Sequence, residues 1–485
     1  MRALPTPGRG APQPPPEEPG SGLRSGRAPG ALPPGEVRHF DPVETLPRPA
    51  LMALQQQRLL AMVEYAYERS AFIRHHWQAA GVHPRDIKST ADFCALAPLM
   101  DKDQMRDWRD RHGDPFCGLL CTEVSDIAFI GSSSGTTGDP TLFSYTWGTP
   151  GTICDGNQPA GPGLAADGPA SYWGGTLRDW WEIGLRPGEY GVFFGLRMRG
   201  PMFRLLQQLG LTPILLGYDP ADLLHFCTLS RDLRPTVFYA MTAYLGAGLV
   251  ELERTQGIDM RDVFASYKGI LFAGEPVGPK MRRTFERWGL GGKIFNQTSF
   301  GDLGHAHDCR AHAGCHAWED IGVAEIIDPV RGTPIVGDGR GELVCSSLIN
   351  PLDPLLRYRG GDIVDMQRGP CECGRTHSRF TPVGRSADEL LVQGLSILPM
   401  DVWGAIEDVP ATEHGLFQIV RPRREMDMLT IRVGYAGSPD LGAVRSALID
   451  SVEAAVGLRA EIELVPEQQI MASGSRHKIP RTVKA

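Results

Sequence analysis

Six short β-rich runs alternate with helical stretches between about residue 127 and residue 299, and this alternation constrains the fold more than any other feature. The runs are IAFIGSS, YGVFFGL, TPILLGY, TVFYAM, GILFAG and KIFNQTS. Several are apolar throughout, which is typical of buried strands in a parallel sheet. Helices between such strands predict a layered α/β domain.

A different pattern starts after about Gly384. A strand, a helix, two strands, a helix and a strand follow, in ELLVQG, PMDVWGAIEDV, LFQIVRP, MLTIRVGYA, LGAVRSALIDSVEAAVG and AEIELV. This order predicts a small α+β domain of about 100 residues. Near the other end, the run from Leu51 to Trp77 places apolar groups three and four apart and predicts helix. Residues 1–40 are rich in Pro and Gly, so we expect a disordered tail there.

The composition limits the classes of function. The net charge of -8 and the pI of about 5.9 argue against a general affinity for nucleic acid or anionic membranes. No run approaches the roughly 18 apolar residues of a membrane span, and the N-terminus lacks the apolar core of a signal peptide. We therefore expect a cytoplasmic protein, in which the ten cysteines are thiols or metal ligands.

A Ser/Thr/Gly loop follows the first β-rich run, where the chain reads SSSGTTGDPT from Ser132 to Thr141. Glycines let the backbone approach an anion, and the hydroxyls and free N–H groups supply donors. The loop predicts a polyphosphate cradle, although its composition alone also fits a flexible polar surface loop. It is not a Walker loop, because no Gly-Lys-Ser/Thr follows. The residues expected to bind phosphate are Ser133, Ser134, Gly135, Thr136, Thr137 and Gly138.

Two close groups of soft ligands lie about 55 residues apart. Cys309, Cys315 and His316 fall in HDCRAHAGCHAWED, and Cys371 and Cys373 fall in GPCECGRTH. Such pairs suit tetrahedral zinc, with unmetallated thiols beside a turn as the alternative.

Several motifs together carry a resemblance to a known family. SSSGTTGDPT resembles the phosphate loop of adenylate-forming enzymes, the superfamily of acyl-CoA ligases, peptide-synthetase adenylation domains and firefly luciferase. The stretch from Tyr67 to Trp108 is similar to the N-terminal region of the phenylacetate–CoA ligase branch. The remaining matches are FAGEP at 272–276, RYRGGD at 357–362, GRS at 384–386 and GSRHKIPR at 474–481, so the likeness covers nearly the whole chain.

The resemblance implies the architecture and the reaction. Residues 41–385 would form an AMP-binding and acyl-binding domain, and 386–485 a small mobile lid domain that pivots near Ala387 or Asp388. The implied activity is that of an acid–thiol ligase, which forms an acyl thioester through an acyl-adenylate. Its implied cofactors are ATP or an acyl-adenylate, Mg²⁺ and coenzyme A. Its implied partners are a small carboxylic acid and the thiol of coenzyme A or a carrier protein.

The resemblance also implies roles for individual residues. Lys478 would bridge carboxylate and phosphate, with Thr298 beside it, although a lysine near a C-terminus is usually a solvated surface group. Asp362 would hold the ribose and Arg385 would contact the nucleotide. The rest of the nucleotide site would be Gly274, Glu275, Pro276, Phe295, Asn296 and Gln297.

An aromatic-rich lining is expected for the acyl group, which suits an aryl or other bulky acid, although at least half of these rings are expected to be simply core. The residues concerned are Phe193, Tyr239, Met241, Tyr244 and Phe300. By the same resemblance, Cys309, His316, Cys371 and Cys373 would hold a structural zinc ion, with Cys315 as the substitute for His316.

Two departures from the family pattern concern the triphosphate. Asp139 stands where the phosphate loop commonly has Lys, and Ser299 replaces a Glu that helps to hold magnesium, with Asp302 as a substitute through a shifted loop. A carboxylate beside polyphosphate is electrostatically unfavourable. These departures leave open a weakly adenylating enzyme that uses a supplied acyl-adenylate and a degenerate nucleotide-binding regulatory protein. An enzyme that loads a carrier protein is a further alternative. The sequence also leaves a homodimer open.

Overall fold

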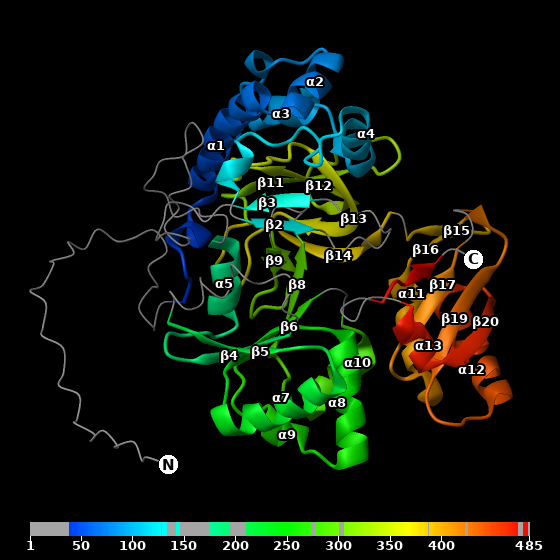
Figure 1. The fold of residues 1–485 in the computed structure, drawn as a ribbon. Helices are drawn as coiled ribbons and strands as arrows, with labels where there is room; N and C mark the ends of the chain where they lie inside the picture. Colours follow the sequence, from blue (N-terminus) through cyan, green and yellow to red (C-terminus); the bar gives the residue numbers. More distant parts are fainter. Residues whose placement is uncertain are drawn as a thin grey trace, which may run out of the picture.

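The chain folds into two stacked layers of sheet and helix with a smaller lobe at their side, as the computed structural model shows (Figure 1). The structure describes residues 38–127, 129–132, 142–145, 174–194, 210–273, 277–299, 305–386, 388–421, 425–473 and 479–483. Most of the predicted tail therefore lies outside the described residues.

A mainly parallel sheet forms one layer, with strand order β5-β4-β6-β7-β8-β9. Its strands are β4 (Tyr190–Phe194), β5 (Thr212–Leu216), β6 (Val237–Met241), β7 (Gly269–Ala273), β8 (Ile294–Ser299) and β9 (His305–His307). All neighbours are parallel except β9, which runs antiparallel to β8. The predicted α/β class is confirmed.

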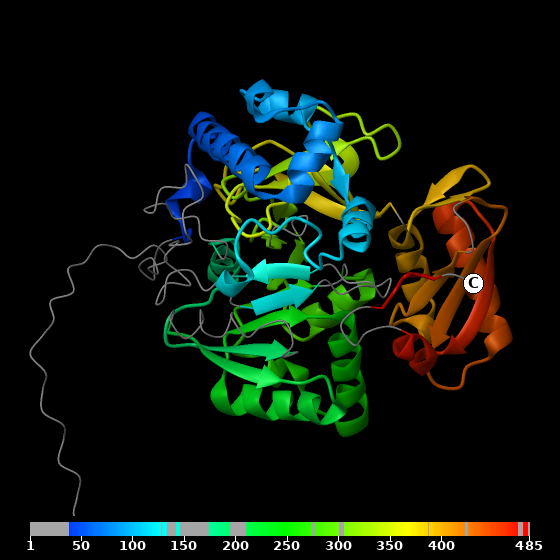
Figure 2. The same cartoon turned by 45° about the horizontal axis from the view of Figure 1, so that its top comes forward.

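Helices cover both faces of this sheet. On one face lie α7 (Pro220–Leu233), α8 (Ala243–Gln256), α9 (Met260–Val263) and α10 (Pro279–Arg287), which close an apolar core (Figure 2). The shorter α5 (Gly174–Glu182) lies on the opposite face. Side chains alternate between the faces, so Phe194 joins the core under α7 whereas Phe193 contacts α5.

The first β-rich run departs from the expected parallel arrangement. It forms β2 (Phe129–Ser132), which pairs antiparallel with β3 (Leu142–Tyr145) in a separate two-stranded sheet. The Ser/Thr/Gly loop between them is too short for the crossover of a dozen or more residues that a parallel connection needs. The run is a strand, as predicted, but it is one arm of a hairpin.

The second layer combines the N-terminal helices with a sheet of order β10-β14-β13-β12-β11 and a short β1 beside β13. Its helices are α1 (Arg48–Arg69), α2 (Ala71–Ala79), α3 (Thr90–Leu96) and α4 (Lys102–His112), with 3-10 turns at Pro42–Thr45, Pro84–Asp86 and Val124–Asp126. Its strands are β1 (Met100–Asp101), β10 (Cys315–His316), β11 (Gly322–Ile327), β12 (Gly339–Ser347), β13 (Tyr358–Gln367) and β14 (Arg379–Arg385).

The helical run predicted from Leu51 to Trp77 is split at Ser70. This serine has an extended backbone, and its hydroxyl accepts a hydrogen bond from the N–H of Ile73. It therefore caps α2 and turns the chain between two helices.

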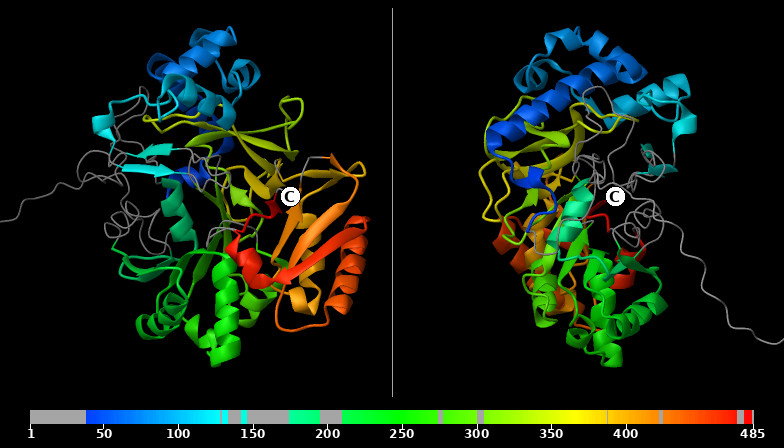
Figure 3. Two further views of the ribbon diagram at one scale, coloured as in Figure 1. Left: turned by 45° about the vertical axis from the view of Figure 1, so that its right-hand side comes forward. Right: turned by 90° about the vertical axis from the view of Figure 1, so that its left-hand side faces the viewer.

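The C-terminal lobe, residues 388–483, lies beside the two layers (Figure 3). It has an apolar core of its own. Its elements are β15 (Leu390–Val392), β16 (Leu395–Ile397), α11 (Pro399–Glu407), a 3-10 turn (Pro410–Thr412), β17 (Phe417–Val420), β18 (Glu425–Met426), β19 (Leu429–Tyr435), α12 (Leu441–Val456), β20 (Ala460–Pro466), α13 (Glu467–Ala472) and β21 (Thr482–Val483). The six predicted elements occur in the predicted order. The domain boundary at 385 and 386 stays a prediction.

None of the helices in the described ranges combines the length and the apolar character that crossing a membrane requires.

Candidate functional site

Aromatic and polar side chains converge at the carboxyl ends of the parallel strands, on the face that α5 covers. Phe193 of β4 and Tyr239 of β6 lie with their ring centroids 5.5 Å apart, and Trp180 of α5 packs edge-on against both at 5.9 and 5.6 Å. Gln297 of β8 lies beside them, with its Nε2 3.4 Å from the Tyr239 hydroxyl. The carboxyl ends of parallel strands are where α/β folds bind ligands, so this is the candidate acyl site.

The C-terminal half of helix α5 is buried on all sides. The five consecutive residues Arg178–Glu182 are at most 4% exposed, although three of them carry formal charges. Buried charges require partners, so the surroundings of α5 must supply counter-charges and hydrogen bonds.

Asp179 forms a buried polar triad with Gln297 and His307. Gln297 donates to Asp179 Oδ2 at 2.8 Å, and His307 Nε2 lies 3.1 Å from Asp179 Oδ1. Burial raises the pKa of Asp179 well above its usual range, against the Gln297 hydrogen bond. Burial and then the Arg375 charge lower the pKa of His307 to about 3.

The proton positions in this triad follow from its contacts. His307 Nδ1 lies 2.5 Å from the Asp308 carbonyl oxygen, which only accepts, so Nδ1 carries the ring proton. Nε2 of the neutral ring is then an acceptor. Burial favours the protonated form of Asp179, which is the form that can donate to Nε2 across the 3.1 Å between the two atoms.

Glu182 ties the end of α5 to two loops of the second layer. Its Oε1 accepts from the backbone N–H of Arg310 at 3.0 Å and from the Arg310 guanidinium at 3.1 Å, and its Oε2 accepts from Arg375 at 2.8 Å. Although burial opposes ionisation, the Arg375 charge and the Arg310 N–H hold the pKa of Glu182 well below its usual range. Glu182 is therefore an ionised anchor between α5 and both loops.

The chain before α1 completes the same ionic cluster. Glu44 accepts from Arg375 at 2.7 Å, and both side chains are fully buried. Asp320 makes two 2.9 Å bonds to Arg178. Asp41 lies 3.4 Å from the same guanidinium. Each arginine is thus shared by two carboxylates from distant parts of the chain.

The two loops that Glu182 anchors also bring the predicted metal ligands together. One potential ligand atom from each of Cys309, His316, Cys371 and Cys373 lies within 4.8 Å of the other three, and all four residues are buried. Cys315 faces elsewhere, with its Sγ 3.7 Å from the Asn296 carbonyl oxygen. A buried set of three thiols and one imidazole fits a tetrahedral zinc ion with no open position.

Asp362 and Arg385, the expected ribose and nucleotide contacts, are neighbours. They pair across β13 and β14, and Arg385 Nε lies 3.2 Å from Asp362 Oδ1. The Arg385 guanidinium also donates to the Gly360 carbonyl at 2.6 Å. Arg385 lies two residues before Ala387, one of the two positions expected for the hinge.

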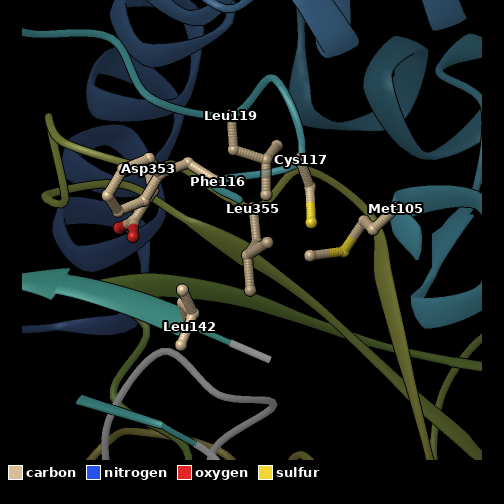
Figure 4. A pocket seen from close by; sticks show the side chains of 7 residues that line it. All are labelled: Met105, Phe116, Cys117, Leu119, Leu142, Asp353 and Leu355. Atoms are coloured by element: carbon tan, nitrogen blue, oxygen red, sulfur yellow. The ribbon is translucent and has the colours of Figure 1, made fainter. Parts of the chain in front are cut away.

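Asp353 fastens the hairpin that carries the predicted phosphate loop. Its carboxylate accepts from the Ser144 N–H at 2.7 Å and from the Asn350 amide at 2.6 Å. It lines a small cavity together with Leu142 of β3 (Figure 4). Burial raises the pKa of Asp353 to about 6. The carboxyl thereby holds β3 to the second layer.

The structure does not bring all the predicted acyl residues together. Met241 and Tyr244 pack on the opposite face, in or against the core under α7 and α8. The ladder between β6 and β7 is irregular between Phe238 and Met241, so the simple alternation that would place Met241 beside Tyr239 fails there. Phe295 contacts His312, and Thr298 is partly exposed on β8.

Other predictions lie outside the described residues. They concern Ser133, Ser134, Gly135, Thr136, Thr137, Gly138, Asp139, Gly274, Glu275, Pro276, Phe300, Asp302, Ala387 and Lys478.

The sequence analysis missed five residues that build the site. These are Asp179, Trp180, Glu182, His307 and Arg375. One signal was present: Arg178–Glu182 reads RDWWE, and two adjacent tryptophans flanked by charges in one short helix cannot place all apolar surface on one side.

No protein-family profile matches the chain. It is similar to a phenylacetate–coenzyme A ligase of Thermus thermophilus, with 30% identity over 396 residues, which is 81% of this chain and 83% of the relative. It is also 29% identical over 444 residues to a phenylacetate–coenzyme A ligase of Aromatoleum evansii, covering 89% of this chain and 93% of the relative.

A solved 2-hydroxyisobutyryl-CoA ligase has the same fold. In its postadenylation state with 2-HIB-AMP it matches with a TM-score of 0.78 at 24% identity, covering 94% of both chains. In its thioesterification state with 2-HIB-AMP and CoA the TM-score is 0.63 at 25% identity, covering 93% of this chain and 94% of that chain. The whole chain therefore superimposes better on the postadenylation state than on the thioesterification state.

Replacing Asp179 by Asn tests the protonation of the buried triad. The asparagine amide donates to His307 and its carbonyl accepts from Gln297, so the variant keeps the contacts of a protonated carboxyl. Proton binding by Asp179 contributes to the free energy of unfolding of the wild type. This contribution is complete below the usual aspartate pKa of 3.8 and is lost as the pH rises towards the raised pKa of the folded state. The unfolding free energy of Asp179→Asn, measured with urea from pH 5 to pH 8, should therefore rise relative to the wild type as the pH increases, by at most about 1.4 kcal/mol per pH unit.

The exposed Asp450 of α12 gives the matched control, because Asp450→Asn should show no such drift. A constant difference between Asp179→Asn and the wild type over this range would show that Asp179 is ionised in the folded protein.

Proposed function

This chain belongs to the phenylacetate–coenzyme A ligase family, and on that premise we propose that it converts an aromatic or otherwise bulky carboxylic acid into a coenzyme A thioester through an acyl-adenylate. It is an acid–thiol ligase of the acyl-CoA synthetase type. The observation that carries the choice of acid is the group of rings of Phe193, Tyr239 and Trp180 at the carboxyl ends of the strands. Such a lining favours a flat apolar group.

The reaction has two half-reactions. In the first, a carboxylate oxygen attacks the α-phosphorus of ATP, the bond to the β-phosphate bridging oxygen breaks, and pyrophosphate leaves. In the second, the deprotonated thiol of coenzyme A attacks the acyl carbon, the bond to the phosphate oxygen breaks, and AMP leaves. The carboxylate thus exchanges a very poor leaving group for a stable anion.

The residues of this chain would serve the first half-reaction by positioning and charge. Lys478 would offset the charge that develops between carboxylate and α-phosphate, and Thr298 would hydrogen-bond the same group. Asp362 would hold the ribose hydroxyls, with Arg385 beside it. The hydroxyls and N–H groups of the loop from Ser133 to Gly138 would bind the phosphates, where Mg²⁺ would add further positive charge.

The triad at Gln297 would form the polar end of the acyl site. Gln297 is uncharged and burial favours the neutral form of Asp179, so this pair would not repel the substrate carboxylate. The hydrogen bonds that Gln297 donates to Asp179 and to the Tyr239 hydroxyl fix its side chain next to the rings of the site. Rigid placement of this kind keeps the acid oriented towards the α-phosphate.

A second candidate function is favoured by the residues around the triphosphate. Asp139 adds negative charge to the expected phosphate loop, and Ser299 lacks the carboxylate that would bind Mg²⁺. Both changes weaken adenylation, whereas the second half-reaction needs neither group. The enzyme would then act chiefly on a supplied acyl-adenylate.

Measuring the two half-reactions separately tests the proposal. With aryl acids, ATP and Mg²⁺, the wild type should release pyrophosphate and, with coenzyme A, form the thioester detected by mass spectrometry. Lys478→Ala should slow pyrophosphate release by roughly 100-fold to 1,000-fold and spare thioester formation from supplied acyl-adenylate. Asp362→Ala should slow both half-reactions, because the ribose is bound in each.

The exposed Lys88 supplies the control, since Lys88→Ala should leave both rates unchanged. Thioester formation only from supplied acyl-adenylate would favour the second candidate function. Transfer to a carrier-protein thiol in preference to coenzyme A would identify a loading enzyme. Absence of any thioester product would contradict the proposal and favour a regulatory nucleotide-binding protein.

We also propose that Cys309, His316, Cys371 and Cys373 hold a structural zinc ion. The mutual proximity and burial of the four ligand atoms support this assignment. A bound zinc ion would cross-link the two loops. Its four protein ligands would leave no open position for catalysis. Because Arg310 and Arg375 on those loops bind Glu182, the ion would also stabilise the end of α5.

Metal analysis of purified variants tests this site. The wild type should contain about one zinc per chain, and Cys373→Ser should contain almost none and unfold at a lower temperature. Cys315→Ser is the matched control, because this buried neighbour contacts Asn296 and should leave the metal in place. Equal metal content in the wild type and Cys373→Ser would refute the assignment, and loss of metal in Cys315→Ser would place Cys315 among the ligands.

A further inference from the structure

Helix α10 of the parallel-sheet layer and helix α11 of the C-terminal lobe meet in one tight contact. Glu407, the last residue of α11, accepts a hydrogen bond from the backbone N–H of Lys280 at 2.6 Å, in the first turn of α10. Its other oxygen accepts from the indole N–H of Trp403 at 2.8 Å. Glu407 is only 2% exposed, so the carboxylate lies sealed between the two lobes.

Charged pairs surround this hydrogen bond. The ammonium group of Lys280 binds the carboxylate of Glu413, and Arg283 lies 3.8 Å from Asp408. In both pairs the cation belongs to α10 and the anion to the C-terminal lobe. The charges on the two surfaces are therefore complementary in the arrangement of the lobes described here.

The same contact reaches the end of the chain that carries Lys478. The guanidinium of Arg481 lies 3.8 Å from the ring centroid of Trp403 and donates to the Gly415 carbonyl at 2.5 Å. The backbone at Arg481 continues into β21, which pairs with β17. Trp403 thus connects Glu407 on one side with the anchored segment just after Lys478 on the other.

Gly278 makes the fit specific to this arrangement. It caps α10 with φ -62°, a backbone conformation that alanine also adopts. A Cβ at this position would lie 2.0 Å from Glu407 Oε1 and 2.5 Å from Trp403 Nε1. Glu407 could yield only by giving up its two hydrogen bonds, because its partners fix both oxygens.

We propose that Gly278 and Glu407 are positioning residues for the first half-reaction: their contact holds the C-terminal lobe, to which Lys478 belongs in the sequence, against the parallel-sheet layer. This inference rests on the proposed function. The whole chain superimposes better on the postadenylation state of the neighbouring ligase than on its thioesterification state. Any arrangement in which α11 moves away from α10 requires the hydrogen bond between Glu407 and Lys280 to break.

Gly278→Ala tests the inference, because the added methyl group excludes this contact between the lobes and leaves the apolar core of each lobe unchanged. Pyrophosphate release should fall by about tenfold or more, because the variant must break the Glu407 hydrogen bonds or separate the lobes. Thioester formation from supplied acyl-adenylate and the unfolding temperature should stay at the wild-type values. Gly291→Ala is the matched control, since its Cβ would meet no atom closer than Glu286 Cγ at 3.7 Å.

A charge exchange gives a second test that leaves the glycine in place. Lys280→Glu should slow pyrophosphate release by about threefold to fivefold through repulsion from Glu413, and adding Glu413→Lys should restore it. If the contact between Lys280 and Glu413 only stabilised the fold, the loss and its rescue would appear in both half-reactions.

Equal rates of pyrophosphate release in Gly278→Ala and the wild type would overturn the inference and leave the proposed function standing. An equal loss in both half-reactions would also overturn it. A wild type that never forms acyl-adenylate would overturn the proposed function and this inference together.

Discussion

The architecture of the candidate site depends on one buried ion pair, between Glu182 and Arg375. Glu182 ends the helix that covers the candidate acyl site, and Arg375 follows the Cys-x-Cys pair of the proposed metal loop. Both are almost fully buried, so neither charge can turn to solvent if its partner is removed. Arg310 extends the pair to the second ligand loop, and Glu44 extends it to the chain before α1. Four distant segments are thereby held in a single arrangement.

This constraint separates a rigid half of the site from a movable half. The rings of Phe193, Tyr239 and Trp180 sit on the parallel sheet and on α5, which the ionic cluster holds in place. The C-terminal lobe instead meets the parallel-sheet layer through side-chain hydrogen bonds and partly exposed ion pairs, which cost little to break. The two proposed half-reactions would use this combination, with the acid held in place while the lobe changes its position.

Sequence patterns predicted the parts of the fold that depend on the local pattern of apolar and polar residues. Apolar runs located five strands of the parallel sheet, and periodicity located the elements of the C-terminal lobe in order. The hairpin of β2 and β3 was not predicted, because an apolar run does not show whether its neighbouring strand is parallel or antiparallel. Tyr239 and Met241 were expected together, but an irregular ladder separates them. The pairing of Asp179 with His307 could not be predicted, since only the folded chain brings α5 beside β9.

A crystal structure with a sulfamoyl analogue of an aryl-adenylate tests the central claim most directly. The account predicts the aryl group against Phe193, Tyr239 and Trp180, the ribose hydroxyls on Asp362, and the C-terminal lobe still in contact with α10. An aryl group on the opposite face of the sheet, among α7 and α8, or an adenosine bound away from Asp362, would contradict it.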